Sequence, residues 1–75
     1  REAQMEEFMF LGLRMVRGVS EKEFYRKFEE KLMTVYGGVI RKNEARGLLI
    51  RKNGRIWLTE RGMDLANIVE SEFLL

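Results

Sequence analysis

Cysteine, histidine and proline are all absent from this 75-residue sequence. Without cysteine the chain can form neither a disulfide framework nor a thiolate metal site. Without histidine it also lacks the commonest general base and transition-metal ligand in proteins. These absences exclude most enzyme chemistry from the chain by itself.

Long apolar runs are missing as well. The longest nearly continuous one, residues 8–15, is interrupted by Gly12 and Arg14 and falls far short of the roughly 20 residues that span a bilayer. No stretch resembles a secretory signal. We therefore expect a cytoplasmic protein without a membrane span.

The length allows a single domain, residues 1–75. At this size folding buries only about 60% of the surface of the extended chain, so the core must be well packed. The sequence opens at Arg1 without an initiator Met. We expect a domain cut from a larger protein.

The first half of the sequence predicts helices. Residues 2–16 form one, with an inner stripe of Met5, Phe8, Met9 and Val16. Further apolar residues lie off that stripe, so this helix is apolar nearly all round and is expected to be buried on more than one side.

Ser20 and Glu23 form a capping box that starts a second helix. Its predicted apolar face is made by Phe24, Phe28 and Leu32. A third helical segment follows, with a break predicted at residues 37–38 and an end near Gly47.

Asn53 and Gly54 separate two β-rich runs and predict a two-residue type I′ hairpin. Counting outward from the turn pairs residue 52 with 55, 51 with 56, 50 with 57 and 49 with 58. Leu49, Ile56 and Leu58 then share one face, while Ile50 and Trp57 lie on the other.

Thr59 is expected to cap a last helix that runs to about Phe73. Its predicted inner stripe consists of Met63, Ala66, Val69 and Phe73. Three helices, a hairpin and a closing helix give a mainly α (α+β) fold with the element order of a winged helix.

No catalytic constellation is present. The neighbouring carboxylates at 6–7 and 29–30 lie on predicted helices, where adjacent side chains diverge by about 100° and cannot form a dyad. The serines have no partner base, so no nucleophile and base pair can be named.

Basic residues concentrate in the middle of the chain. The net charge is 0 over residues 1–38, +5 over 39–62 and −3 over 63–75. The candidate basic face comprises Arg41, Lys42, Arg46, Arg51, Lys52 and Arg55. These cations are typical of an ordinary solvated surface, of a winged-helix module that contacts duplex DNA, or of a contact with another anionic partner.

Phe10, Leu13, Ile50 and Trp57 are candidates for a second apolar surface outside the core. A large apolar patch on a soluble domain usually marks an interface. The alternative is that this small fold recruits all of them into one core. The five Met residues are interpreted as adaptable core filler.

One block, residues 7–14 (EFMFLGLR), is followed by Gly18 and Val19, and a second block, residues 58–62 (LTERG), closes the hairpin. In this order they resemble the C-terminal domain of the oxygen-independent coproporphyrinogen III oxidase family, which includes heme chaperones. The resemblance extends from about residue 6 to residue 73. The compact second half is more similar to the chaperone branch, and the choice between branches stays open.

The resemblance implies a radical S-adenosylmethionine parent of porphyrin metabolism, with a 4Fe-4S cluster held by an N-terminal barrel. This chain has no cysteine, so the cluster, the S-adenosylmethionine and the chemistry would lie outside it. The domain would cover the open side of the barrel and help to enclose a tetrapyrrole, either porphyrinogen or heme.

In this interpretation the barrel of the same chain is the partner, and we do not expect nucleic acid to be one. Phe10, Leu13 and Trp57 would dock on the barrel. Arg14, a charge within an apolar run, would pair across the interface or meet a propionate of the ligand.

Overall fold

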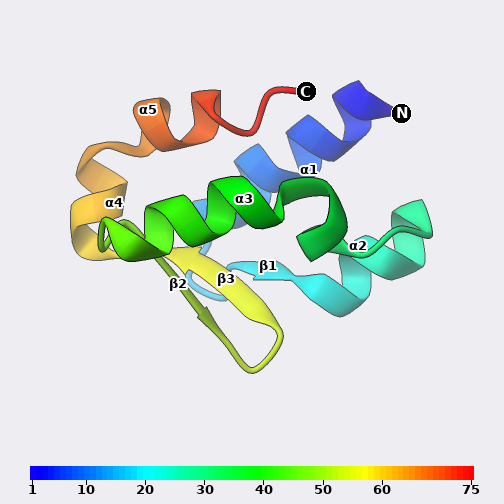
Figure 1. Cartoon of the computed structure of the whole chain (residues 1–75), viewed down its shortest axis with the longest axis horizontal. Helices are drawn as coiled ribbons and strands as arrows, with labels where there is room; N and C mark the ends of the chain where they lie inside the picture. Colours follow the sequence, from blue (N-terminus) through cyan, green and yellow to red (C-terminus); the bar gives the residue numbers. More distant parts are fainter.

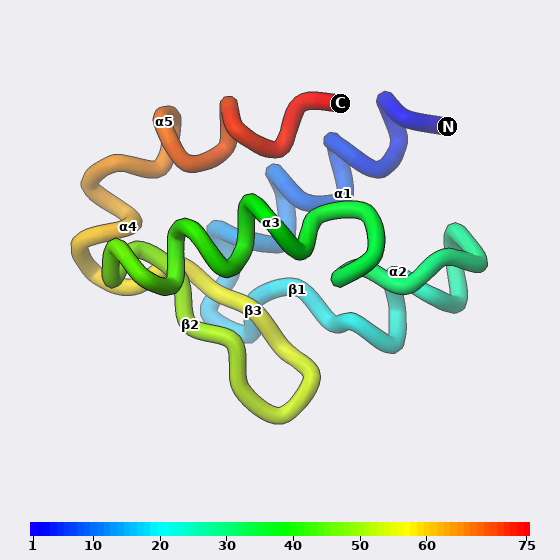
Figure 2. Tube along the Cα trace, in the orientation of Figure 1, coloured from blue at the N-terminus to red at the C-terminus, as the bar shows by residue number.

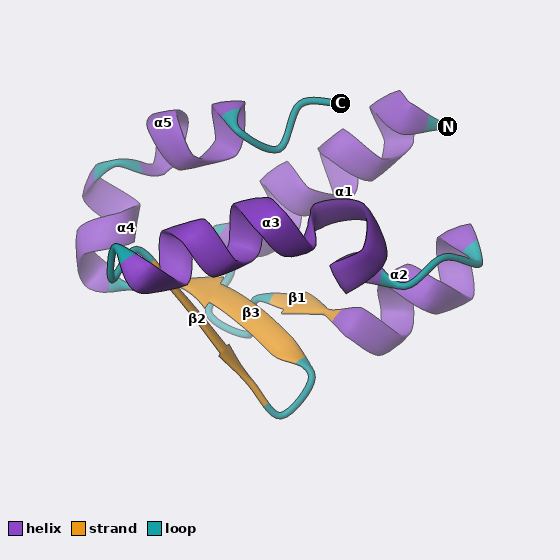
Figure 3. Cartoon of the chain, in the orientation of Figure 1, coloured by secondary structure: helices purple, strands orange, loops and turns teal.

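The computed structural model describes all 75 residues and shows five helices around a small antiparallel sheet (Figures 1 and 3). In chain order the elements are α1 (Glu2–Leu13), β1 (Val19–Ser20), α2 (Glu21–Phe28), α3 (Leu32–Ala45), β2 (Leu49–Lys52), β3 (Arg55–Leu58), α4 (Glu60–Asp64) and α5 (Ala66–Ser71). The predicted α+β class is confirmed. None of the helices is long and apolar enough to cross a membrane.

Helix α1 is shorter than predicted and is buried on one side only. Met5, Met9 and Leu13, spaced four residues apart, are buried. The helix ends at Leu13, and a turn follows in which the amide of Gly18 donates to the carbonyl of Met15. Val16 therefore lies outside the helix and is 97% exposed, so its predicted place on the inner stripe is wrong.

Of the two hydrogen bonds in the capping box predicted at Ser20, the one to the Ser20 hydroxyl is confirmed. The amide of Glu23 donates to Ser20 Oγ at 3.1 Å, and Phe24 and Phe28 are buried as predicted. Ser20 also belongs to β1, which pairs with β3 and completes a sheet of order β1-β3-β2. This two-residue strand was not predicted, because it is too short to show a periodic pattern.

Helix α3 runs without interruption through Gly37 and Gly38, so the predicted break is wrong. Two glycines cost a helix roughly 1 kcal/mol each. Leu32, Tyr36 and Ile40 lie one helical turn apart on the buried side, and their packing keeps the helix continuous. The predicted end near Gly47 is confirmed by its left-handed φ of +75°.

The hairpin has the predicted turn and register. Asn53 and Gly54 both have positive φ angles, 53° and 75°, as a type I′ turn requires. All four predicted pairs occur, from Leu49 with Leu58 to Lys52 with Arg55.

The closing helix is divided in two at Leu65. Thr59 caps α4 as predicted, since its Oγ1 accepts from the amide of Gly62 at 3.0 Å. In α4 it is Gly62 that faces the sheet. Met63 is therefore 46% exposed, and its predicted place on the inner stripe is wrong.

One core of 16 buried residues joins these elements. Five aromatic rings meet in it or at its edge, mostly edge to face or tilted: Phe8, Phe24, Phe28, Tyr36 and Phe73. The segment from α5 to the C-terminus runs antiparallel to α1, so that both termini lie at the same end of the molecule (Figure 2). The amide of Leu75 donates to Glu6 at 2.8 Å there.

Candidate functional site

Arg14 lies at the end of α1 and binds side chains of α5. Its guanidinium forms a two-pronged ion pair with Glu70 and donates to Asn67 Oδ1 at 2.9 Å. The hydrogen bond with Glu70 is the main reason why the pKa of Arg14 is raised. The charge that interrupts the apolar run of α1 is therefore paired within this chain.

The predicted docking residues differ in accessibility. Leu13 is fully buried in this chain's own core, which corrects the prediction that it docks on another domain. Phe10 is partly buried and packs against the same core. Trp57 is half-buried on the face of the hairpin that points away from the core.

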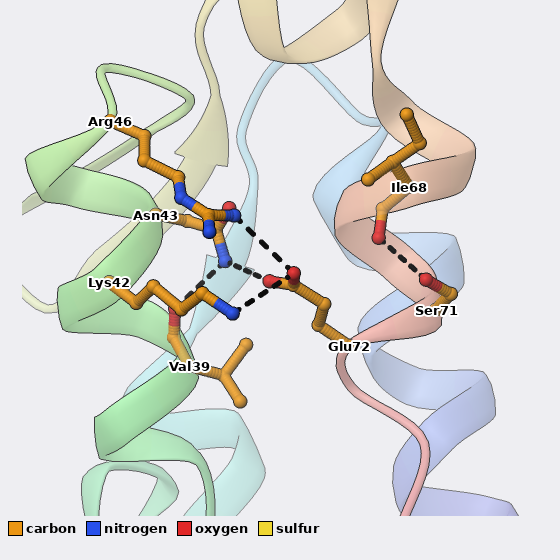
Figure 4. Close-up of polar contacts among 7 residues, drawn as sticks. All are labelled: Val39, Lys42, Asn43, Arg46, Ile68, Ser71 and Glu72. Atoms are coloured by element: carbon orange, nitrogen blue, oxygen red, sulfur yellow. Dashed lines mark hydrogen bonds and ion pairs between the residues drawn. The ribbon is translucent and has the colours of Figure 1, made fainter.

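Lys42 and Arg46, two members of the predicted basic face, point at one carboxylate. Their side-chain nitrogens lie 3.3 and 3.4 Å from Glu72 Oε2, while Asn43 Nδ2 donates to Glu72 Oε1 at 2.9 Å (Figure 4). The bond from Asn43 is the largest cause of the lowered pKa of Glu72. This network ties α3 to the segment that follows α5.

Arg51 is also paired, with both of its prongs on Glu21 at 3.0 and 3.1 Å. Arg41 lies over the Cα of Gly37, and Arg55 reaches the carbonyl of Arg17. Three of the six predicted basic residues, Lys42, Arg46 and Arg51, are thus paired with carboxylates of this chain, the first two with the same one.

We call Ile50, Lys52, Arg55 and Trp57 the outer sheet face. Ile50 pairs with Trp57 and Lys52 with Arg55 across the hairpin, so all four side chains share one side of the sheet. Ile50 is 40% exposed, and neither cation has a carboxylate partner within salt-bridge distance. An apolar and aromatic strip thus borders two free positive charges.

A second surface was missed by the sequence interpretation. We call it the α1-end patch, and its members are Leu11, Met15, Val16, Met63 and Ile68, which are between 46% and 97% exposed. Leu11 lies in α1 and Met15 in the turn that follows it. Their i, i+4 spacing within the apolar run was the pattern that could have indicated this surface. The two exposed Met residues also show that the interpretation of every Met as core filler was wrong for this pair.

No group of three or more acidic side chains is arranged to hold a metal ion. The chain also has no cysteine or histidine, so a 4Fe-4S cluster would need ligands from outside it. The arrangement offers surfaces for contact.

A family model described as "HemN C-terminal domain" matches residues 1–65. The chain is 38% identical over 73 residues to a protein of Bacillus subtilis (strain 168) named "Heme chaperone HemW", covering 97% of this chain and 19% of that protein. It is 39% identical over 75 residues to the protein of the same name from Lactococcus lactis subsp. lactis (strain IL1403), covering 100% of this chain and 20% of that one. The chain therefore spans about a fifth of the length of these relatives. No solved structure matches the chain.

Proposed function

Because this chain belongs to the HemN C-terminal domain family, we propose that it is the accessory C-terminal domain of a larger, cytoplasmic heme chaperone. It covers the open side of a radical S-adenosylmethionine barrel and helps to enclose a tetrapyrrole. The family membership confirms the predicted resemblance. The observation that supports the proposal best is the identity to two heme chaperones over nearly the whole chain.

The amino-acid composition indicates which part of the parent would hold the cluster. A radical S-adenosylmethionine site needs cysteine ligands for its cluster, and this chain has none. The cluster, the S-adenosylmethionine and any redox step then belong to the remaining four fifths of the parent. This domain contributes contact area and charge.

The outer sheet face has the chemistry that a tetrapyrrole requires. A tetrapyrrole is a flat, largely apolar ring system with carboxylate side chains. The indole of Trp57 can pack against the ring, and the free cations of Lys52 and Arg55 can pair with the carboxylates. Ile50 extends the apolar strip beside Trp57.

The test is to titrate heme into the full-length protein and to monitor binding by the change in the absorbance spectrum of heme. Trp57→Ala is expected to weaken binding by roughly threefold to tenfold, since aromatic packing contributes about 0.5–1.5 kcal/mol. Trp57→Phe should recover most of the loss. Tyr25→Ala is the matched control, because Tyr25 is an exposed aromatic residue on α2 and is not a member of the outer sheet face.

Binding that is equally tight in Trp57→Ala and the wild type would remove the outer sheet face from the ligand site. If the parent protein binds heme equally well after this whole domain has been deleted, the enclosing role itself is refuted.

A winged-helix DNA-binding function is not favoured. Half of the predicted basic residues are paired with carboxylates of this chain, which leaves fewer charges for phosphates. Duplex affinity that falls steeply with salt would be the expected result for such a module. We expect no duplex binding by the full-length protein at moderate salt.

A further inference from the structure

We infer that the α1-end patch is the surface by which this domain docks on the larger part of its own polypeptide. The inference rests on the proposed function and names the contact surface within it. The patch gathers five of the large hydrophobic side chains that the fold leaves exposed, and Val16 is 97% accessible. An apolar concentration of this kind marks an interface.

The shape of this region suits a docking surface. Leu11 and Met15 form a ridge that borders one hollow of about 320 Å³, which extends to α2. Met63 and Ile68 border a second hollow of about 310 Å³ on the other side of Arg14. A partner can therefore cover a ridge and insert side chains on both sides of it.

The charge next to the ridge is already compensated. Arg14 is held by Glu70 and Asn67, so covering it does not leave an unpaired cation. Asp64 is the remaining ionisable group that lines the second hollow. The first hollow is lined by Glu7, Glu23 and Lys27 as well as by apolar residues. We therefore expect the partner to place apolar side chains on the ridge and polar groups over this hollow.

The occupant follows from the length of the relatives. A domain held in the same chain does not need the ~800 Å² per partner of a standard interface between separate chains, because the tether supplies a high effective concentration. In the relatives, about four fifths of the chain lies outside the matched region, and this is the occupant that we assign.

The methionines provide a built-in test, because oxidation of Met side chains follows their exposure. If the patch were free, Met15 (60% exposed) and Met63 (46%) would react with peroxide faster than Met33, which is less exposed and lies in a different groove. In the full-length protein we expect the opposite order, with Met15 and Met63 roughly tenfold slower than Met33. Mass spectrometry after a brief peroxide pulse measures all three rates, normalised to the urea-unfolded protein.

Two variants keep the test independent of folding. Val16→Asp lies outside any helix and changes an exposed residue, and it should restore fast oxidation of Met15 and Met63. Tyr25→Asp, at a less exposed site on α2 (54%) that borders the groove of Met33, should leave Met15 and Met63 slow. Met5 and Met9 are buried in the core and must stay slow in every variant that is folded.

Fast oxidation of Met15 and Met63 in the full-length wild type would overturn the inference. So would protection that disappears on dilution, because a second copy would then be the occupant. If Met33 is oxidised slowly while Met15 and Met63 are oxidised fast, another face of the domain docks on the parent. The proposed accessory role would then remain. If Trp57→Ala does not weaken heme binding but Met15 and Met63 are still oxidised slowly, the proposed ligand role is refuted and this docking surface remains.

Discussion

Gly62→Ala is expected to destabilise the domain, although alanine is the better helix former. Gly62 lies in α4 where this helix approaches the backbone of Leu48, the residue before β2. A Cβ atom at Gly62 would lie 2.1 Å from the carbonyl oxygen of Leu48, well inside van der Waals contact. The atom in the way belongs to the backbone, so no side-chain rotation can relieve the overlap.

The magnitude follows from what must move. Separating α4 from Leu48 by about 1 Å strains the hydrogen bond from the Thr59 amide to the Leu48 carbonyl, now 3.0 Å long, which is worth about 1 kcal/mol. Overpacking adds about 1–3 kcal/mol, and the helix propensity of alanine returns about 1 kcal/mol. The net loss in the free energy of unfolding is about 2 kcal/mol, which lowers the melting temperature by roughly 8–16 °C for a domain of this size.

Gly38→Ala is the matched control, because Gly38 lies inside α3 and a Cβ there would meet nothing within 4 Å. This variant should gain about 1 kcal/mol from helix propensity alone. Urea unfolding of the two variants beside the wild type measures both effects. If Gly62→Ala stabilises the domain as Gly38→Ala does, the close approach of α4 to the backbone of Leu48 is wrong.

Two further substitutions concern ionisable groups. Tyr36→Phe should raise the free energy of unfolding by about 1 kcal/mol, because the buried hydroxyl of Tyr36 has no hydrogen-bond partner. Burial raises the pKa of Tyr36 from 10.0 to about 12, so wild-type stability should fall as the pH rises through this range, and urea unfolding should show a smaller fall in the variant. Glu72→Gln should cost about 0.5–1 kcal/mol at neutral pH by removing the ion pairs with Lys42 and Arg46. Because the pKa of Glu72 is lowered in the fold, chiefly by Asn43, this difference should vanish as the pH falls below that pKa, and a constant difference would contradict it.

Local chemistry made much of the fold predictable. The Asn53–Gly54 turn and the caps at Ser20 and Thr59 depend on residues that are adjacent in sequence, and all three are confirmed. The errors arose where distant contacts decide the outcome. The unbroken α3 depends on packing across the core, and β1 exists only because β3 lies beside it.

The candidate site was less predictable for the same reason. An apolar residue in α1 can face the core or the solvent, and the packing of α1 on the distant strand β3 helps to decide between them. Leu13 proved to be buried and Leu11 exposed, although both belong to the same apolar run. The partner of Arg14 lies 56 residues away along the chain, beyond the reach of any spacing argument.

The pairing of β1 with β3 also sets the order in which the domain can fold during synthesis. Val19 pairs with Ile56, and the amide of Glu21 donates to the carbonyl of Gly54 at 2.9 Å. The core further includes Phe73, which is fully buried. On the ribosome the first two helices therefore wait, with their apolar faces uncovered, until residue 73 has emerged. We expect the domain to fold in one cooperative step once this residue has left the ribosome, and chaperones that bind nascent chains to meet its first half unfolded.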